Sequence, residues 1–326
     1  MVFSLPTLSY ALAFFSLPSF TQWINSYNRS YNSAQEYASR QNIYLANLIK
    51  IAKHNSENHT WTMGVNNFTD LTSSEFKQQY SGRYRARPTY DSLEGFGDIL
   101  ENVTALPTYV NWTEMGAVTP VKNQGQCGSC WAFSTTGSVE GSTFLSTQKL
   151  VSLSEQQLVD CSGAEGNQGC NGGLMDYGFQ YIINNKGITS ESNYPYNAAN
   201  NNCNINETKN VVASISGFKD VPVNSESALM TAIAMQPVSV AVEADQDSFQ
   251  LYSGGVMTAK CGSNLDHGVL AVGYGTLGNE DYWIVKNSWG ADWGMNGYIL
   301  LGRGPQYGSS GQCGIQMDPS YPIFKN

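Results

Sequence analysis

The sequence predicts an α+β protein built from two packed lobes. Helical patterns dominate up to about residue 210, and short runs of β-branched or aromatic residues follow, an order that is typical of α+β folds. With 326 residues, the chain is long enough for about two domains. We expect a functional site in the cleft between the lobes, because ligands usually bind where packed units meet.

Helices are expected first. Residues 20–57 favour helices because the stretch Ala34–Asn55 lacks Pro and Gly and places apolar residues near helical spacing. The run Cys130–Leu145 alternates aromatic and small residues, which indicates a buried helix with close neighbours. Residues 150–158 suggest another helix with Ser154 as its N-cap. The expected strands are Val211–Ile215, Val238–Val242, Gly268–Tyr274 and Tyr282–Asn287.

Charge argues against one class of function. The formal net charge is −9. Residues 1–105 carry eight acidic and eight basic side chains, so the whole acidic excess lies in residues 106–326. A nucleic-acid-binding protein needs basic clusters to neutralise phosphates, and we therefore expect no nucleic-acid partner.

The first 19 residues are expected to be a signal peptide. Residues 1–20 contain no charged side chain, and the apolar run Leu12–Leu17 is too short to span a membrane, which takes about 20 residues. Pro6 and Pro18 interrupt this stretch, and no Lys or Arg precedes it, unlike most signal peptides. No other segment is apolar enough for stable membrane insertion.

The cysteine count indicates three disulfides and one free thiol. The chain has seven cysteines, none of them before Cys127. Cys127 and Cys130 lie in the glycine-rich stretch 124–134, either as a C-x-x-C redox or metal motif or as one structural and one reactive cysteine. Disulfides and sequons both fit a secretory route. The glycosylation candidates are Asn28, Asn58, Asn67, Asn102, Asn111 and Asn206.

A reactive cysteine needs a base, because a thiol attacks a carbonyl only as the thiolate. His267 is the only histidine after residue 105, so it is the only histidine base available to Cys130 in that part of the chain. A lone histidine is more often a core or surface residue, but His267 opens a strand-like run and the cysteine count leaves a free thiol. Asn287 is the candidate for orienting the imidazole.

These segments resemble the catalytic blocks of papain-family cysteine proteases, whose local signature includes C-G-S-C-W with a downstream His and Asn. The matching segments are Gln124–Ser134, Asp266–Gly268 and Asn287–Gly290. Upstream, a series of residues resembles the ERFNIN signature of cathepsin L-type propeptides, with Tyr44 in place of the usual Phe: Glu36, Arg40, Ile43, Tyr44, Asn47, Ile51 and Asn55. The G-x-N-x-F-x-D motif of the same prosegments is matched by Gly64, Asn66, Phe68 and Asp70.

The resemblance implies a papain-like fold with a helical left lobe, a β-barrel-like right lobe and an active-site cleft between them. Cys130 would be a thiolate at a helix N-terminus, paired with the His267 imidazolium. Gln124 and the Cys130 N–H would bind the oxyanion. Asn287 would orient His267, and Trp289 would shield their hydrogen bond. The enzyme would be a monomer without metal or cofactor that cleaves proteins and peptides through an acyl-enzyme.

The resemblance also implies a zymogen. The expected parts are a signal peptide (1–19), a helical inhibitory prodomain (20–77), a linker with the processing site (78–105) and a mature peptidase domain (106–326). Six cysteines permit 15 pairings, of which the resemblance selects Cys127–Cys170, Cys161–Cys203 and Cys261–Cys313. This pairing removes Cys127 from a redox motif, and the mature part lacks the histidines or a second close cysteine pair for zinc.

The family's S2 positions correspond to mostly apolar residues, which predicts a bulky hydrophobic residue at P2 of the substrate: Leu174, Met175, Ala241, Leu265, Gly268 and Asp318. Gly173, next to Gly172, would pair with the substrate backbone, and the Asp266 carbonyl would accept on the other side. Asp318 lies at the expected pocket floor, where cathepsin L has a small residue. Our hypothesis is that it lets the pocket accept Arg; the alternative is an exposed Asp before Pro319.

Acid is expected to release the prodomain, because a carboxylate such as Asp70 with a depressed pKa would lose its stabilising effect as the pH falls. The resemblance implies a lysosome or other acidic vesicle, or secretion, and cystatin-like inhibitors as further partners. Two other function classes stay open: an inactive binding or storage protein on the same fold, and a prosegment that inhibits proteases in trans.

Overall fold

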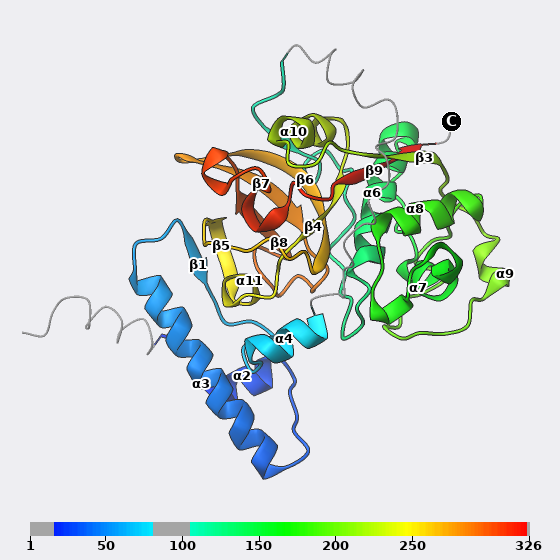
Figure 1. Cartoon of the computed structure of the whole chain (residues 1–326). Coiled ribbons are helices and arrows are strands. Elements are labelled where there is room, and N and C mark those ends of the chain that lie inside the picture. The colour runs from blue at the N-terminus through cyan, green and yellow to red at the C-terminus, as the bar shows by residue number, and fades with distance from the viewer. Residues whose placement is uncertain (1–15, 81–104, 325–326) are drawn as a thin grey trace, which may run out of the picture.

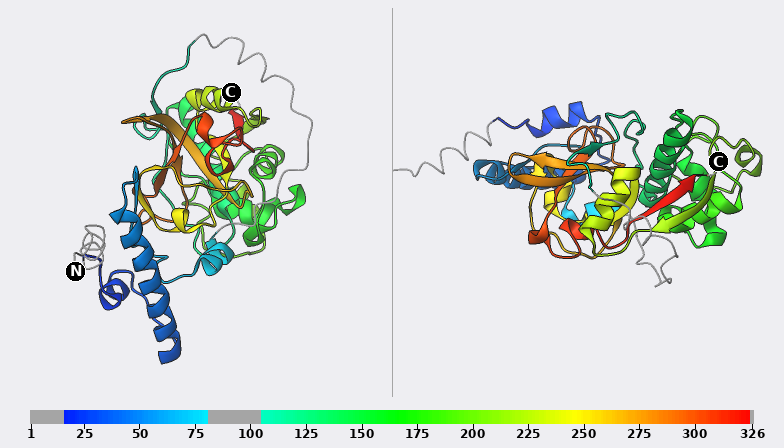
Figure 2. Two further views of the ribbon diagram at one scale, coloured as in Figure 1. Left: turned by 60° about the vertical axis from the view of Figure 1, so that its left-hand side comes forward. Right: turned by 90° about the horizontal axis from the view of Figure 1, so that it is seen from above.

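The computed structural model describes residues 16–80 and 105–324. An N-terminal helical unit lies along one side of a sheet lobe, and a helical lobe lies on the other side (Figure 1). Seen from above, β3 and β9 extend from the sheet lobe toward the helical lobe (Figure 2). The predicted α+β class is confirmed, with neighbouring solved structures of the same fold described below.

The N-terminal unit, called the prodomain from here on, contains α2 (Phe20–Ser26), α3 (Ala34–Ser56), β1 (Trp61–Met63) and α4 (Ser73–Tyr80). Ser33 caps α3, since its side chain accepts a hydrogen bond from the Glu36 N–H. Aromatic rings form the core between α2 and α3, where Trp23 and Tyr44 are buried. Tyr44 stands in place of the usual Phe, and its hydroxyl donates to the Pro18 carbonyl at 2.8 Å.

The start of the prodomain includes residues before Phe20. Ser19 caps α2 in a reciprocal capping box with Gln22, and Leu17 packs against the aromatic core. Pro18 accepts the Tyr44 hydrogen bond. We therefore propose that a signal peptide ends before Leu17 rather than at residue 19. Residues 1–15 and most of the proposed linker lie outside the described residues.

The helical lobe contains α6 (Cys130–Thr147), α7 (Glu155–Cys161), α8 (Met175–Asn184) and α9 (Ile205–Thr208), with short 3₁₀ turns at η1 (Ser162–Glu165) and η2 (Gly169–Asn171). Every residue of α6 from Cys130 to Thr143 is buried. Small residues make this possible, because they let neighbouring segments approach the helix axis closely. Ser154 caps α7 as predicted, accepting from the Gln157 N–H at 3.0 Å, but the helix begins at Glu155.

The sheet lobe is a nine-stranded sheet in the order β1-β5-β8-β7-β6-β4-β9-β3, with β2 added beside β6. The pairing follows an open path in the described residues and does not close a barrel. Two helices, α10 (Glu226–Met235) and α11 (Asp247–Gln250), and the 3₁₀ turns η3 (Pro305–Tyr307) and η4 (Gln312–Gly314) complete the lobe. Its strands are β2 (Val110–Asn111), β3 (Ile215–Asp220), β4 (Val238–Val242), β5 (Tyr252–Met257), β6 (His267–Leu277), β7 (Glu280–Lys286), β8 (Tyr298–Gly302) and β9 (Ser320–Phe324).

One predicted strand is misplaced. The run Val211–Ile215 was expected to be a strand, but β3 begins at Ile215 and Val211 and Val212 are exposed. Ala213 instead forms an isolated bridge with Ile188 of the helical lobe. This segment joins the two lobes, so tertiary pairing overrides its β-branched composition.

Three disulfides are present: Cys127–Cys170, Cys161–Cys203 and Cys261–Cys313. The first two lie in the helical lobe, and the third lies in the sheet lobe. Cys130 is the free cysteine among the described residues. These pairs are those that the family resemblance implies.

The prodomain docks onto the sheet lobe through strand pairing and through hydrogen bonds that involve the buried Gln250. Strand β1 pairs antiparallel with β5. The buried Gln250 side chain donates to the Phe68 and Leu71 carbonyls at 2.9 and 3.0 Å, and Asn66 donates back to the Gln250 carbonyl at 2.7 Å. The Gly64 N–H also donates to the Leu251 carbonyl at 2.8 Å, so three residues of the G-x-N-x-F-x-D motif contact this part of the chain directly.

The expected role of Asp70 as an acid-labile carboxylate is wrong. Burial raises the pKa of the Asp70 carboxyl, and this outweighs the hydrogen bond from the Tyr31 hydroxyl at 2.9 Å and the nearby charges of Arg29 and Arg40. A group whose pKa is raised in the docked state binds its proton more tightly there. Protonation of Asp70 therefore favours the folded prodomain as the pH falls.

Substitution of Gly141 is expected to destabilise the packing of α6. A Cβ at position 141 would lie 2.5 Å from the ring Cγ of Pro237, and a proline ring cannot move aside as a flexible side chain can. Gly141→Ala should cost about 1–3 kcal/mol, as overpacking usually does. The measurement is the thermal midpoint of the proenzyme. Gly163→Ala is the control, because a Cβ at Gly163 meets nothing within 4 Å; equal midpoints for the two variants would contradict the expectation.

Candidate active site

Cys130 is the first residue of α6, directly after the N-cap Ser129. Its thiol is 1 % exposed and takes part in no disulfide. The α6 backbone N–H groups converge at this end, so the helix dipole favours negative charge on the sulfur.

His267 is the first residue of β6 and is fully buried. Its Nε2 lies 2.7 Å from Asn287 Oδ1, and the same oxygen accepts the Ser288 backbone N–H at 2.8 Å. A backbone N–H can only donate, so the Asn287 atom must be the oxygen and Nε2 must carry a proton. In a neutral ring the unprotonated nitrogen is then Nδ1, which is the nitrogen able to act as a base.

The chain next to His267 packs directly against the start of α6. A Cβ on Gly268 would lie 3.2 Å from Trp131 Cα and 3.3 Å from Trp131 N. Glycine at 268 therefore permits β6 to approach the first turn of α6. The structure brings Cys130 and His267 to the same junction of the two lobes, from elements that are 137 residues apart in the sequence.

Gln124 is buried at this junction and is held at both ends of its amide. Its Nε2 donates to the Cys127 carbonyl at 2.9 Å, and its Oε1 accepts from Ser288 Oγ at 2.7 Å. Its backbone N–H also donates to the Ser288 carbonyl at 2.8 Å. The disulfide from Cys127 to Cys170 fixes the turn between Gln124 and Cys130.

Trp289 covers the imidazole. Its ring stacks on His267 with centroids 4.6 Å apart and an interplanar angle of 26°. Burial lowers the pKa of His267 to about 4, against the opposing effect of the Asn287 hydrogen bond. In the proenzyme, therefore, the surroundings disfavour an isolated imidazolium.

The prodomain covers this tryptophan in turn. Phe68 and Phe76 pack edge-on against Trp289, with centroids 5.7 and 5.0 Å away. Aromatic edge-to-face contacts of this kind are specific as well as apolar. The prodomain thus closes over the residues that surround His267.

Most of the residues expected to line the S2 pocket lie close together in the structure. Met175 and Ala241 belong to one buried cluster, and Leu265 packs against it. Gly268 pairs with Ala241 in the β4–β6 register, and a Cβ there would lie 3.2 Å from Met175 Sδ. Leu174 is also buried. Asp318 is 5 % exposed, so the alternative of an Asp turned to solvent is wrong.

The two glycines expected to face the substrate lie beside Trp131. A Cβ on Gly173 would lie 2.2 Å from Asn167 Oδ1 and 2.8 Å from Trp131 Cε2, so this position has no room for a side chain. Gly172 has φ +108, a backbone conformation that favours glycine. Asp266 is partly exposed, and its Oδ1 accepts the Ala244 N–H at 2.8 Å.

The glycosylation candidates differ in exposure. Asn28, Asn58 and Asn206 are exposed, and Asn111 is partly exposed in β2. Asn67 is also partly exposed, and its Oδ1 atom is buried without a hydrogen-bond partner. Asn102 lies outside them.

Among the described residues, no group of three or more His, Cys, Asp or Glu side chains could hold a metal ion. In the same residues, no helix combines the length and apolarity needed to cross a membrane.

Sequence reasoning missed several polar residues that hold the site together. Ser288 links Gln124 to Asn287, and the signal available was its place between Asn287 and Trp289 in one motif. Tyr196 donates to the Gln124 carbonyl at 2.8 Å, but nothing in the sequence connects these two positions. Lys122, Glu140, Glu155 and Lys286 form a buried charge cluster that separate sequence segments supply.

Comparison with known proteins identifies the chain. The model of the papain family cysteine protease domain matches residues 106–323. The chain belongs to the papain family of cysteine proteases. A cathepsin propeptide inhibitor domain (I29) matches residues 20–76, so the papain-family domain is preceded by an inhibitory propeptide and the chain is a zymogen.

Its similarity to relatives extends over most of the chain. A senescence-specific cysteine protease of Oryza sativa subsp. japonica is 48 % identical over 302 residues, covering 92 % of this chain and 88 % of the relative. The cysteine endopeptidase RepA of the same organism is 50 % identical over 305 residues, covering 90 % and 79 %. This chain is accordingly a papain-family cysteine endopeptidase.

Solved proforms show the same arrangement of propeptide and protease. The proform of Amb a 11, a cysteine protease and major ragweed pollen allergen, has a TM-score of 0.87 at 39 % identity and covers 94 % of each chain. The recombinant stem bromelain precursor has a TM-score of 0.86 at 41 % identity, covering 94 % of this chain and 98 % of that one. The papain-like fold is thus confirmed.

Proposed function

We propose that this papain-family zymogen hydrolyses peptide bonds through a thiolate at Cys130 and an imidazolium at His267. The observation that carries the proposal is the tautomer of His267: its Nε2–H is committed to Asn287, which leaves Nδ1 to take the proton of a thiol. The α6 N-terminus stabilises the resulting thiolate.

The proposed reaction has two halves. The Cys130 sulfur attacks the scissile carbonyl carbon, the carbonyl becomes an oxyanion, and His267 then gives its Nδ1 proton to the leaving amine as the C–N bond breaks. In the second half, His267 takes a proton from a water molecule, and the resulting nucleophile breaks the thioester and frees Cys130. Asn287 holds the ring in one orientation throughout.

The oxyanion is assigned to two donors that flank the nucleophile: the Gln124 side-chain amide and the Cys130 backbone N–H. Gln124 Nε2 is fixed by its neighbours before substrate binds, since Ser288 holds the other end of the amide. Each such preorganised donor contributes up to about 3 kcal/mol to transition-state binding.

The nucleophile assignment predicts how the zymogen matures. Wild-type proenzyme should process itself at about pH 4–5 and stay latent at neutral pH, because carboxylates titrate near that range. Cys130→Ala proenzyme should remain intact at acid pH. The measurement is the mass of the chain over time, with no added protease, and with wild-type proenzyme held at neutral pH as the control. Processing of Cys130→Ala at the wild-type rate would exclude an autocatalytic mechanism.

Two prodomain groups have the pKa shifts that acid release requires. The Glu75 carboxyl is partly buried, which alone raises its pKa, but the Thr72 N–H and Arg40, which lies 3.0 Å away, together lower it below 4.5. A depressed pKa stabilises the folded prodomain above the ordinary value, and this stabilisation is lost as the pH falls through the value in the folded state. Glu75 therefore acts only below about pH 4.5.

His54 responds at higher pH. Burial lowers its pKa from 6.5, and the charge of the neighbouring His59 acts in the same direction. The two imidazoles stack 4.1 Å apart beside Trp61, whose strand pairs with β5. Because the pKa of His54 is lowered, as that of Glu75 is, His54 stabilises docking above pH 6.5 and loses that effect as the pH falls. We propose that it loosens β1 before Glu75 titrates.

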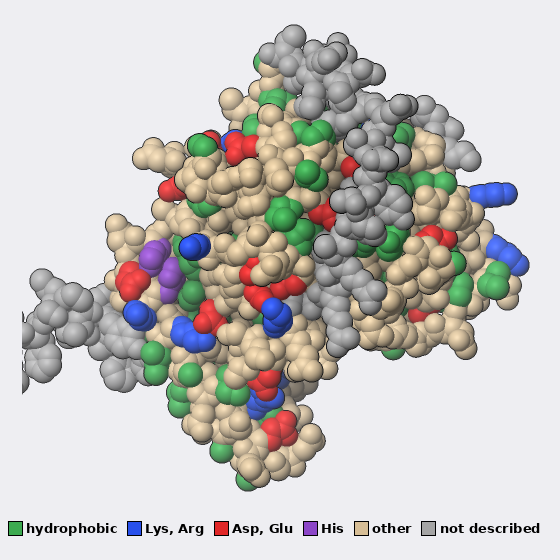
Figure 3. Space-filling model, in the orientation of Figure 1, with side chains coloured by type: hydrophobic (Ala, Val, Ile, Leu, Met, Phe, Trp, Pro, Cys, Tyr) green, Lys and Arg blue, Asp and Glu red, His purple; other side chains and the backbone are tan. Residues whose placement is uncertain are grey.

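The charged groups around this histidine pair come from both domains. Lys53 and Glu57 flank it within the prodomain, and the His59 Nε2 lies 2.8 Å from Glu57 Oε2. Across the interface, Asp247 and Lys260 line the same hollow of about 550 Å³. The histidine side chains are visible at the surface, beside acidic and basic ones (Figure 3).

Replacing His54 with glutamine should therefore lower the pH needed for processing. Gln can still donate to the Trp61 carbonyl, as His54 Nε2 does at 3.1 Å, but it cannot gain a proton. The pH of half-maximal processing should fall by a few tenths of a unit. Lys53→Gln, a substitution at an exposed neighbouring residue, is the control. An unchanged midpoint for His54→Gln would contradict this role.

We also propose a P2 preference for bulky hydrophobic residues, with Arg accepted through Asp318. The support is the apolar set of Met175, Ala241 and Leu265, together with the burial of Asp318 near the end of the chain. A substrate guanidinium could form charge-assisted hydrogen bonds with the Asp318 carboxylate.

Asp318→Ala should separate the two substrate classes. Cleavage of an Arg-Arg reporter peptide should fall at least about tenfold, the size expected for a charge-assisted hydrogen bond, while a Phe-Arg reporter should change little. The measurement is kcat/KM for both reporters. Equal cleavage of the two reporters by wild type and variant would rule out the role of Asp318.

The place of action is proposed to be an acidic vesicle such as a lysosome, or outside the cell after secretion. The disulfides support an oxidising route, and the histidine and carboxylate shifts support an acidic destination. Cystatin-like inhibitors are proposed as partners of the mature enzyme. An inactive scaffold is disfavoured because Cys130, His267 and Gln124 are all present and adjoin one junction. The prosegment as an inhibitor in trans is tested by adding residues 16–80 to mature enzyme.

A further inference from the structure

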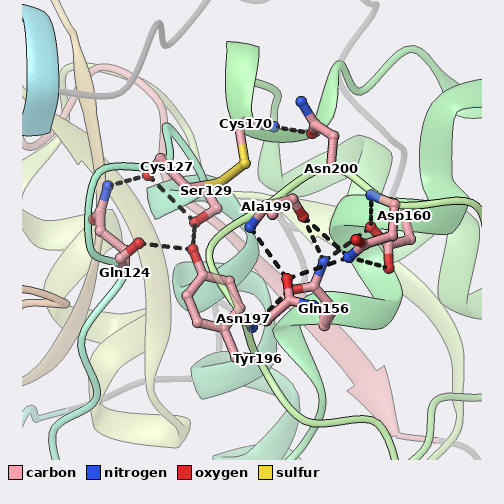
Figure 4. The surroundings of a disulfide bond; sticks show 12 residues. Gln124, Cys127, Ser129, Gln156, Asp160, Cys170, Tyr196, Asn197, Ala199 and Asn200 are labelled. Atoms are coloured by element: carbon pink, nitrogen blue, oxygen red, sulfur yellow. Dashed lines mark hydrogen bonds between the residues drawn. A yellow bond between two sulfur atoms is a disulfide. The ribbon is translucent and has the colours of Figure 1, made fainter.

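Tyr196 contacts both ends of the turn that carries the oxyanion donors. Its hydroxyl oxygen lies 2.8 Å from the Gln124 carbonyl oxygen and 2.6 Å from Ser129 Oγ (Figure 4). Gln124 begins this turn, and Ser129 ends it as the N-cap of α6. A single phenol therefore bridges the residue with the proposed side-chain donor and the residue before the proposed backbone donor, Cys130.

The direction of these two hydrogen bonds follows from their chemistry. A carbonyl oxygen can only accept, so the one proton of the Tyr196 hydroxyl points to Gln124. The Ser129 hydroxyl must then donate to Tyr196. Burial is the main cause that raises the pKa of Tyr196, so the phenol keeps its proton at every pH at which the enzyme would work.

The loop that carries Tyr196 is itself fastened to α7. Gln156 donates to the Ala199 carbonyl at 2.7 Å and accepts the Asn197 N–H at 3.0 Å. Asp160 accepts the Asn201 N–H at 2.9 Å. Figure 4 shows these contacts on the opposite side of the loop from Gln124. The loop that carries the phenol is therefore fixed to α7, and the phenol is not a freely rotating surface group.

Two further contacts join this loop to the first turn of α6 and to the disulfide. The Tyr196 ring packs edge-on against Phe133, with centroids 4.9 Å apart. Asn200 Oδ1 accepts the Cys170 N–H at 2.7 Å, next to the disulfide that anchors Cys127. The disulfide fixes the middle of the turn, and Tyr196 fixes its two ends.

We propose that Tyr196 is a positioning residue for the oxyanion hole. It holds the Gln124 main chain and the α6 N-cap at a constant separation, so that the two oxyanion donors need no rearrangement when charge develops on the substrate oxygen. The inference rests on the proposed function, in which Gln124 and Cys130 supply those donors. Tyr196 acts through them and does not touch the substrate.

The main test compares Tyr196→Phe with Tyr194→Phe. Both variants lose a phenol hydroxyl from the same loop, but the Tyr194 hydroxyl donates to Asp160 at 2.8 Å and does not contact the turn. Each proenzyme is processed by added pepsin, so that maturation does not depend on the activity of the variant. The measurements are kcat, KM and the inhibition constant of a peptide aldehyde, whose thiol adduct places an oxyanion in the hole.

For Tyr196→Phe, kcat should fall about three- to tenfold with little change in KM, as expected for one lost neutral hydrogen bond, and aldehyde affinity should fall in proportion. Tyr194→Phe should leave all three close to wild type. The alkylation rate of Cys130 by iodoacetamide should be unchanged in both variants, which shows that the thiolate and the fold are intact. Wild-type kcat and aldehyde affinity in Tyr196→Phe would overturn the proposal.

Gln124→Ala separates this inference from the proposed function. If Gln124→Ala retains wild-type kcat, the oxyanion assignment itself fails. If Gln124→Ala loses activity and Tyr196→Phe does not, only the role of Tyr196 fails. In the double variant, Tyr196→Phe should have less effect than in the wild-type background, because one of the two donors that Tyr196 positions is already absent; full additivity would contradict the proposal.

A second substitution covers the case in which Tyr196→Phe does not fold. Ser129→Ala removes the other partner of the same hydroxyl and leaves the phenol in place. It should lower kcat and aldehyde affinity together, by a smaller factor than Tyr196→Phe. A folded Ser129→Ala enzyme with unchanged kcat and aldehyde affinity would also overturn the proposal.

Discussion

The contact between Gln124 and Ser288 joins the two lobes at the point where the chemistry is proposed to occur. Ser288 donates through its hydroxyl at 2.7 Å and accepts the Gln124 N–H at 2.8 Å, while its own N–H fixes the Asn287 oxygen. The oxyanion donor and the residue that orients the base therefore meet at one serine. A displacement of one lobe would disturb both, and misplacement of catalytic groups by even about 1 Å can cost two orders of magnitude in rate.

A buried group of four charges lies behind this contact and spans the same junction. Lys122 binds Glu140 at 3.1 Å and Glu155 at 2.6 Å, and Lys286 of β7 donates to Thr119 at 3.0 Å. Burial raises the pKa of Glu155 to about 7 and lowers that of Lys286 to about 8. Desolvation is the largest cause of both shifts, whereas the charges of Glu140 and Glu155 raise the pKa of Lys122 despite its burial. The two lysines and two carboxylates compensate one another, and separating the lobes would break that compensation.

Much of the site could be predicted from the sequence, because its chemistry depends on counts and short motifs. An odd cysteine number leaves one thiol, and a single histidine after residue 105 leaves one base. The contacts that position these groups could not be predicted, since Tyr196 meets Gln124 across 72 residues. The Asp70 expectation failed for a related reason: local charge suggests a lowered pKa, but burial, which only the fold determines, reverses the sign.

Trp289 links catalysis to latency. It stacks on His267, and a dry environment around the His267–Asn287 hydrogen bond strengthens that bond. The prodomain packs against the same ring through Phe68 and Phe76. Phe68 and Phe76 thus cover the ring that stacks on His267, and burial lowers the pKa of this imidazole to about 4. An imidazolium is then unfavourable except with a thiolate beside it. The prodomain thus occupies the surface around the histidine, which is where a substrate would have to reach it.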